Sequence, residues 1–382
     1  MTEKLYYQDA GLLTFTARVL DCREAPGGWA VTLSRTAFYP EGGGQPADHG
    51  VLGESAVLDV QERGDVIEHL CAAPLPIGAE TTGRVDGARR RDLVEQHSGE
   101  HIVSGLICAA FSCSNVGFHI GKETVTIDFD AEFSMEQLSP LERQANALIR
   151  ENVPVEIFTP APAELERLHY RSKKAIDGPV RLVRFPGADL CACCGLHVQR
   201  TGELGLVKFL SCIRSRGGAR VELKCGRRAV EHVLDVWEQN AAVSRLTSAK
   251  LLETAPAVAH LQEELRQERE RAAQWEGAAF AARAERYRGA GDTLLIEPPL
   301  PPDSARRLAT AVSQAAGGRC AVFAGGEGEG WRYAVVAPDE DLRPLAKALN
   351  AALSGRGGGR SDCIQGSAAA GEEEIRRFFA GR

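Results

Sequence analysis

Histidines and cysteines with the spacing of metal ligands occur at two distant places in the sequence. His97 and His101 are separated by three residues, and the segment Cys191–His197 holds three cysteines and one histidine. Because residues four apart share one face of a helix, a helical segment would point both imidazoles in the same direction. Zinc prefers about four nitrogen and sulfur ligands in a tetrahedron, and two pairs from separate segments often supply them. The pattern predicts one zinc ion per chain.

The spacing alone leaves the thiol ligand open. Cys193 is four residues before His197, Cys194 is three before it, and Cys191 forms a Cys-x2-Cys pair with Cys194. A rival site would use Cys191, Cys194, Cys212 and a further thiol without the histidines; we disfavour it because Cys212 lies in an apparent strand and lacks paired spacing. The interpretation without a metal is a pair of surface histidines and a buried, unreactive group of cysteines.

Two further features suggest binding. Three glycines follow one another at Gly42, Gly43 and Gly44. Ordering them in a regular element costs backbone entropy, so we expect this segment to need a close approach of its backbone or a positive φ angle. The alternative is a flexible hairpin loop. The segment from Gln199 to Arg228 carries eight basic residues against two acidic ones. Such a run predicts a surface that faces phosphates, although a solvated strand face is the alternative.

The elements that must position these residues follow from hydrophobic periodicity. Residues 1–88 show short alternating runs separated by Gly and Pro, which predicts a small β-barrel or sandwich. In residues 89–226, helices and strands do not strictly alternate, which indicates an α+β domain. Its expected elements are a helix at 88–111, a turn-rich break at 113–121, a strand at 123–129, a helix at 134–152 that opens with the capping pattern Ser134-x-x-Gln137, and a helix at 163–172.

The rest of the chain divides into two further parts. Residues 227–288 are charged and mostly helical, with Pro256 expected to separate two helices, and Val258, Leu261, Leu265 and Trp275 lie on a coiled-coil seam. We expect a helical hairpin or stalk there. Residues 289–382 predict a compact α/β domain with strands near 293–296, 320–324 and 332–337, helices near 303–316 and 341–354, and a final glycine-rich loop at 357–366. The expected fold is therefore α+β and multidomain.

Composition excludes several classes of protein. The chain has 382 residues, an ordinary 25% of charged residues, and no apolar run long enough for a membrane span. An odd number of cysteines, eleven, and an N-terminus without a secretory signal favour reduced thiols and a cytoplasmic location. The net charge of −7 argues against coating by nucleic acid but allows a local basic face.

Four ordered motifs together resemble a known family. His97-x3-His101 with Cys193-x3-His197 resembles the metal motifs in the editing domain of alanyl-tRNA synthetase and in its free-standing relatives, the AlaX-type alanyl-tRNA editing proteins. The triglycine segment 35–46 and the segments 117–121 and 126–128 are similar to further motifs of that family. Residues 357–366 resemble the signature of the synthetase C-terminal domain, which suggests the long form. One departure is Cys194, which follows Cys193 where the family has glycine.

The resemblance implies a function and a set of site residues. It implies zinc-dependent hydrolysis of mischarged tRNA(Ala), chiefly Ser-tRNA(Ala) and also Gly-tRNA(Ala), without amino-acid activation. Action in trans is expected because the barrel-like segment begins so soon after Met1. The implied zinc ligands are His97, His101, Cys193 and His197. The implied substrate-binding residues are Thr36, which could bond the serine hydroxyl, Gly42, Gly43, Gly44 and Gln45. The residues expected to bind tRNA are Arg214, Arg216, Arg220, Gly358, Gly359 and Arg360.

Other assignments stay open from the sequence. No catalytic residue is identified, because Glu100 is expected to point away from the histidines and His119 is expected to be a core residue rather than a proton shuttle. The alternative functions are a non-catalytic, zinc-containing protein that binds tRNA, and a zinc-stabilised scaffold. A homodimer through the helical stalk or the C-terminal domain is a further hypothesis.

Overall fold

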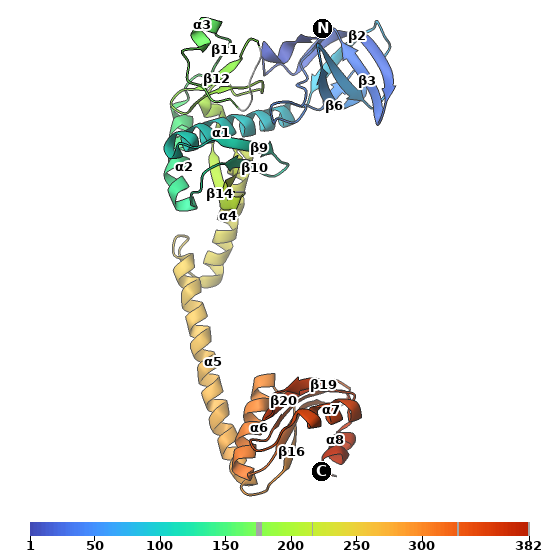
Figure 1. Ribbon diagram of the computed structural model, residues 1–382, viewed down its shortest axis with the longest axis vertical. Helices are drawn as coiled ribbons and strands as arrows, with labels where there is room; N and C mark the ends of the chain where they lie inside the picture. The colour runs from blue at the N-terminus through green and yellow to red at the C-terminus, as the bar shows by residue number, and fades with distance from the viewer. Residues whose placement is uncertain (173–177, 216, 327, 381–382) are drawn as a thin grey trace. The chain divides into compact units, whose positions relative to one another are not determined.

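The computed structural model describes residues 1–172, 178–215, 217–326 and 328–380 (Figure 1). The predicted α+β, multidomain character is confirmed, since several sheets and helices divide between two compact units, Met1–Ala242 and Val243–Arg382. The finer division at residues 88, 226 and 288 stays a prediction. No helix among the described residues is both long and apolar enough to cross a membrane.

The first unit opens with a closed β-barrel. Its strands follow the order β2 (Thr14–Ala25), β3 (Gly28–Leu33), β7 (Val66–Cys71), β6 (Ser55–Arg63), β5 (Gly50–Leu52) and β8 (Glu80–Val85). Outside the barrel, β1 (Glu3–Lys4) and β4 (Arg35–Thr36) form a short parallel pair. Alternation places Phe15, Ala17 and Val19 in the buried core while the residues between them stay exposed.

Helix α1 (Gly87–Phe111) is the central element of the same unit. Asp86 caps it by accepting hydrogen bonds from the backbone N–H groups of Ala88 and Arg89. Every residue from Leu93 to Ile107 is buried, so the helix is enclosed on all sides. It contacts helix α2 (Met135–Glu151) and strands of two sheets. The predicted capping box at Ser134 and Gln137 is confirmed at the start of α2.

Two antiparallel sheets surround α1. One has the order β14 (Val207–Ser215), β15 (Gly218–Cys225), β10 (Val125–Phe129) and β9 (Asn115–Ile120), and the other has the order β11 (Glu156–Phe158), β12 (Leu182–Phe185) and β13 (Asp189–Ala192). Two predictions here are wrong. The expected break at 113–121 contains strand β9, whose Gly117 pairs with Asp128; the register shifts between this pair and the next one, Asn115 with Phe129. The expected helix at 163–172 is limited to α3 (Pro162–Leu165), which is followed by turns and an isolated bridge at Arg171.

Two long helices follow, α4 (Gly226–Thr247) and α5 (Thr254–Ala284). The break between them comes before Pro256, which lies in the first turn of α5. Backbone N–H groups in a first turn have no partner within the helix, so proline is tolerated there. Val258, Leu261, Leu265 and Trp275 are exposed on α5, so a partner for the predicted seam stays a hypothesis.

The second unit contains a five-stranded sheet in the order β16 (Thr293–Glu297), β17 (Cys320–Gly326), β18 (Gly330–Val336), β20 (Cys363–Ala368) and β19 (Arg356–Gly359). Its helices are α6 (Pro302–Ala316), α7 (Arg343–Ala352) and α8 (Glu372–Ala380). The prediction of a loop at 357–366 is wrong, because most of this segment forms the paired strands β19 and β20. Glycine permits the pairing: a Cβ at Gly357 would lie 2.2 Å from the Tyr333 hydroxyl.

A buried ion pair fixes the start of α1 to the barrel side of the unit. The Arg90 guanidinium donates to both carboxylate oxygens of Asp48 and to the carbonyl oxygens of Ala10 and Ala37. The side chains of Arg90 and Asp48 are 3% and 0% exposed. Since neither charge can return to water, the pair must stay intact for α1 to keep its position.

Replacement of Arg90 by methionine therefore leaves the Asp48 charge buried and unpaired. We expect Arg90→Met to lower the unfolding free energy of the α1 region by about 3–5 kcal/mol, measured by hydrogen exchange of α1 peptides. Arg91→Met is the control, because Arg91 is exposed, and it should change protection by less than about 0.5 kcal/mol. Equal protection in the two variants would contradict the assigned role.

Candidate metal centre

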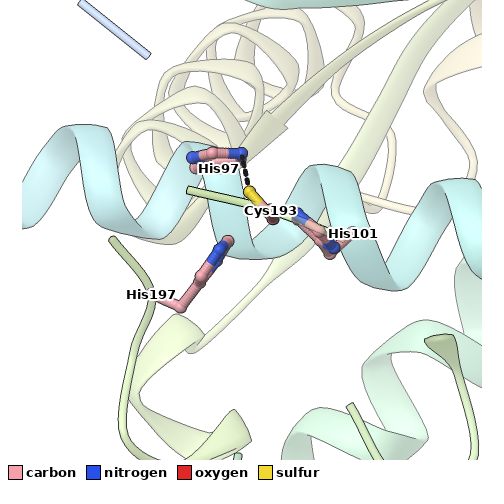
Figure 2. Close-up of side chains that lie close together, drawn as sticks. All are labelled: His97, His101, Cys193 and His197. Carbon is pink, nitrogen blue, oxygen red and sulfur yellow. Dashed lines mark hydrogen bonds between the residues drawn. The ribbon is translucent and has the colours of Figure 1, made fainter. Parts of the chain in front are cut away.

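The structure brings the four predicted ligands together. One ligand atom each of His97, His101, Cys193 and His197 lies within 4.8 Å of the others. Figure 2 shows the two α1 histidines facing Cys193 and His197, which come from the segment after β13. The His97 Nε2 atom is 3.5 Å from Cys193 Sγ. The three histidines are buried and Cys193 is half-buried. We refer to these four residues as the His/Cys cluster.

Close packing of glycines sets this geometry. A Cβ on Gly195 would lie 2.0 Å from Cε1 of His97, so only glycine lets the segment pass over that ring. A Cβ on Gly105 would lie 2.2 Å from the Ala188 carbonyl oxygen, so glycine also lets α1 approach the turn before β13. The sequence did not identify either glycine, because the contact joins segments far apart in the chain.

Hydrogen bonds orient the two helical histidines. Nδ1 of His97 lies 2.9 Å from Oε1 of Gln45, and Nδ1 of His101 lies 3.0 Å from Oδ2 of Asp189. An Nδ1–H that donates to such an acceptor leaves the Nε2 lone pair free to bind a metal. Arg171 holds Asp189 in turn through two hydrogen bonds of 2.7 Å. Asp189 and Arg171 were missed as site residues, since no local spacing marks them.

The charges of the cluster suit a metal ligand set. Burial alone would raise the pKa of the Cys193 thiol, but the neighbouring imidazoles lower that pKa well below its usual value. Burial lowers the pKa of His197 to about 3, so its imidazole is neutral. Thiolate and neutral imidazole are the forms that coordinate zinc. Burial alone would lower the pKa of His101, but the Cys193 thiolate, Asp189 and Glu100 raise that pKa to about 10, so this imidazole must release a proton when a metal binds.

His197 supplies the strongest indication of an absent partner. Both its Nδ1 and Nε2 atoms are buried, and neither has a hydrogen-bond partner among the described residues. Buried ring nitrogens are rarely left without a partner, because the loss of hydration is costly. A cation held by the four side chains would satisfy one of these nitrogens, so the residues present fit zinc.

The other thiols are arranged differently. Cys191 is buried and can group with His101 and Asp189, but that carboxylate is already held by Arg171. Cys194 is exposed, and its carbonyl oxygen accepts hydrogen bonds from Tyr7 and Tyr39. The rival set of Cys191, Cys194 and Cys212 does not form a candidate metal group within the described part of the chain.

The triglycine bend packs beside the cluster. Gly43 and Gly44 have φ angles of 59° and 83°. A Cβ on Gly44 would lie 2.4 Å from the ring of Phe118, and that ring stacks on His97 at 5.3 Å between centroids. Gln45, at the end of the bend, is fully buried, and its Nε2 atom has no hydrogen-bond partner among the described residues. The bend therefore places Gln45 in contact with the His/Cys cluster.

Thr36 lies in a different environment from Gln45. It is fully buried, and its hydroxyl bonds Nε2 of His69 at 2.8 Å and the N–H of Phe38 at 3.1 Å. Its hydroxyl is thus already engaged by groups on the barrel side.

The arginines expected to bind tRNA are largely paired. Arg214 lies 2.6 Å from Glu132, and Arg220 makes two hydrogen bonds of 2.7 Å to Asp128. Arg216 lies outside the described residues. Gly358, Gly359 and Arg360 are exposed at the β19 edge in the second unit.

Two other expectations at the site are wrong. His119 is exposed rather than a core residue, because it lies on the outward side of β9. Glu100 does not point away from the histidines: its Oε2 is 3.9 Å from Nε2 of His101, and its carboxylate accepts hydrogen bonds from Ser104 and Asn115.

Comparison with known proteins identifies the relatives of this chain. Residues 180–222 match the family model of the threonyl and alanyl tRNA synthetase second additional domain. The chain is 31% identical over 244 residues to alanyl-tRNA editing protein Aarsd1-A of Xenopus laevis, a match that covers 63% of this chain and 59% of that protein.

Alanine–tRNA ligases match as well. The ligase of Halorubrum lacusprofundi is 38% identical over 243 residues, which covers 60% of this chain and 26% of the ligase. That of Pyrobaculum neutrophilum is 30% identical and covers 96% of this chain and 42% of the ligase. The chain thus spans less than two thirds of each of these relatives.

A solved structure, the C-Ala domain of Aquifex aeolicus alanyl-tRNA synthetase, matches 23% of this chain and 86% of that domain at 18% identity, but its TM-score of 0.21 is too low to assign a fold. The matching sequences confirm the resemblance seen in the motifs: the chain is related to the alanyl-tRNA editing proteins and to the alanine–tRNA ligases.

Proposed function

We propose that this protein hydrolyses the ester bond of mischarged tRNA(Ala), chiefly Ser-tRNA(Ala), with Gly-tRNA(Ala) as a second substrate. The observation that carries the proposal is the convergence of the His/Cys cluster with Gln45. Relatives named alanyl-tRNA editing proteins support the substrate class. Action in trans stays a prediction.

The chemistry explains why a second site is needed. A small apolar pocket rejects an added hydroxyl by only about 10²-fold, so an activating site for alanine also admits serine. Hydrolysis of the wrong ester supplies the missing discrimination. The sequence expectation that Thr36 selects serine requires its hydroxyl to give up or share its bonds to His69 and Phe38. Gln45 is the better placed contact, because it touches the cluster directly.

In this proposal His97, His101, Cys193 and His197 hold the zinc ion. Zinc bound there would supply positive charge and Lewis acidity beside the ester. Asp189 keeps His101 in the tautomer whose Nε2 faces the cluster, and Oε1 of Gln45 does the same for His97. The buried Nε2 of Gln45 is then free to donate a hydrogen bond to the carbonyl oxygen of the substrate ester, where charge develops during hydrolysis.

Deacylation of Ser-tRNA(Ala) is the direct test. We expect purified protein with one zinc per chain to release serine much faster than alanine from tRNA(Ala), and a chelator to abolish the reaction. Cys193→Ser should lower kcat/KM at least about a hundredfold and reduce bound zinc, because the thiolate ligand is lost. Cys212→Ser, at a half-buried thiol outside the cluster, is the control. Zinc and tRNA binding without turnover would favour the non-catalytic alternative.

A change at Gln45 can separate its two roles. Gln45→Glu keeps an acceptor oxygen for His97 and for the N–H of Leu196 but removes the Nε2 donor. We expect bound zinc to stay at one per chain while kcat falls by about 10²-fold or more. Unchanged kcat in a zinc-loaded variant would show that the donor does not contact the reacting ester.

Asp189 should act through His101. Asp189→Asn weakens the acceptor that orients the imidazole, and we expect zinc affinity to fall by about 10–100-fold in a competition titration with a chelating dye. Asp128→Asn is the matched control, because Asp128 also accepts two hydrogen bonds from an arginine but is half-buried and lies outside the His/Cys cluster. Equal zinc affinity in the two variants would refute this role.

A further inference from the structure

A basic groove lies next to the triglycine bend in the first unit. It has a volume of about 510 Å³ and is formed by residues after the bend, the first turns of α1, the turn that follows β9, and the start of α4. Its charged lining comprises Arg89, Lys122, Arg227 and Arg228 together with Asp86 and Asp92. Arg227 and Arg228 belong to the basic run from Gln199 to Arg228, but Arg89 and Lys122 come from distant segments, so that run did not reveal the groove.

The two carboxylates of the groove are already engaged. Asp92 accepts hydrogen bonds from Nε and Nη2 of Arg228 at 2.8 and 2.6 Å. Asp86 accepts the backbone N–H groups at the start of α1. Neither carboxylate is paired with Arg89, Lys122 or Arg227 in the described structure. The side-chain charges of Arg89 and Lys122 therefore have no carboxylate partner in the groove lining, whereas Arg227 pairs with Glu231 outside it.

The three remaining cations have few competing partners. Arg89 donates through Nε to the carbonyl oxygen of Ala47. Arg227 pairs with Glu231 one helical turn away, where both side chains are more than half exposed, and such pairs are weak. Lys122 is exposed and makes no hydrogen bond or ion pair to any residue that the structure describes. A multiply charged anion could therefore bind without breaking a buried pair.

The groove adjoins the His/Cys cluster along two chain segments. Pro46 lines it, and the preceding residue, Gln45, bonds His97. Ile120 and Gly121 line it, and Phe118, on the same strand, stacks on His97. Gln45 and Pro46 are consecutive, and a single residue lies between Phe118 and Ile120, so the groove wall and the cluster contacts are close in both segments.

We infer that this groove binds backbone phosphates of the tRNA acceptor end and leads its terminal ester to the His/Cys cluster. The inference rests on the proposed function, which makes a polyanionic RNA the substrate. Phosphate contacts fix the position of a nucleic acid without reading its sequence, and cations spaced along a hollow suit that task. A protein with net charge −7 needs such a local surface to hold RNA.

The test uses two residues that have no buried partner. We expect Lys122→Ala/Arg227→Ala to raise KM for Ser-tRNA(Ala) roughly tenfold and to reduce the slope of log(kcat/KM) against log salt by about 2, with kcat within about twofold. Hydrolysis of 3′-O-seryladenosine, which carries no phosphate, should be unchanged. Filter binding of uncharged tRNA(Ala) should weaken by a similar factor, which measures the groove independently of turnover.

Arg63→Ala/Arg150→Ala is the control, because it removes the same charge from exposed positions of the same unit. It should leave KM and the salt slope near those of the unchanged protein. If the groove variant binds tRNA and deacylates it like this control, the groove is not the phosphate site, while the proposed function stands. If the unchanged protein lacks deacylase activity, the proposed function fails. Filter binding of uncharged tRNA(Ala) to the groove variant then still decides whether RNA phosphates bind in the groove.

Discussion

The complete burial of helix α1 is the constraint on which the site depends. Because every residue from Leu93 to Ile107 is enclosed, the histidines at 97 and 101 must find partners inside the protein. They meet Cys193 and His197 on one side and the acceptors Gln45 and Asp189 on the others. The same helix is fixed by the Arg90–Asp48 ion pair and by its contacts with the sheets. It therefore both holds the first unit together and positions two residues of the site.

Much of this could be predicted from the sequence. Period-2 alternation in residues 1–88 indicated the strands of a small barrel or sandwich, and the Ser134 capping pattern located the start of α2. The spacing drew attention to His97, His101 and the segment Cys191–His197, and the resemblance to editing domains chose Cys193 among the three thiols of that segment. These signals are local, or are repeated in a family, and for that reason they can be read along one chain.

What the sequence could not supply depends on contacts between distant segments. The orientation of His101 by Asp189 and Arg171 requires the turn before β13 to approach α1, which depends on Gly105. Basic residues from Gln199 to Arg228 looked free, yet pairing across strands and to loops occupies Arg214 and Arg220, whereas Lys122 and Arg227 meet only in the fold. The glycines of the expected 357–366 loop misled, because at β19 glycine permits close strand pairing.

We propose that three imidazoles and one thiolate share a single zinc ion. X-ray absorption at the zinc edge of the purified protein measures that ligand shell directly. We expect three nitrogen neighbours at about 2.0–2.1 Å and one sulfur at about 2.3 Å, with the sulfur shell lost on replacing Cys193. A shell dominated by sulfur, or one that keeps its sulfur without Cys193, would contradict this ligand set.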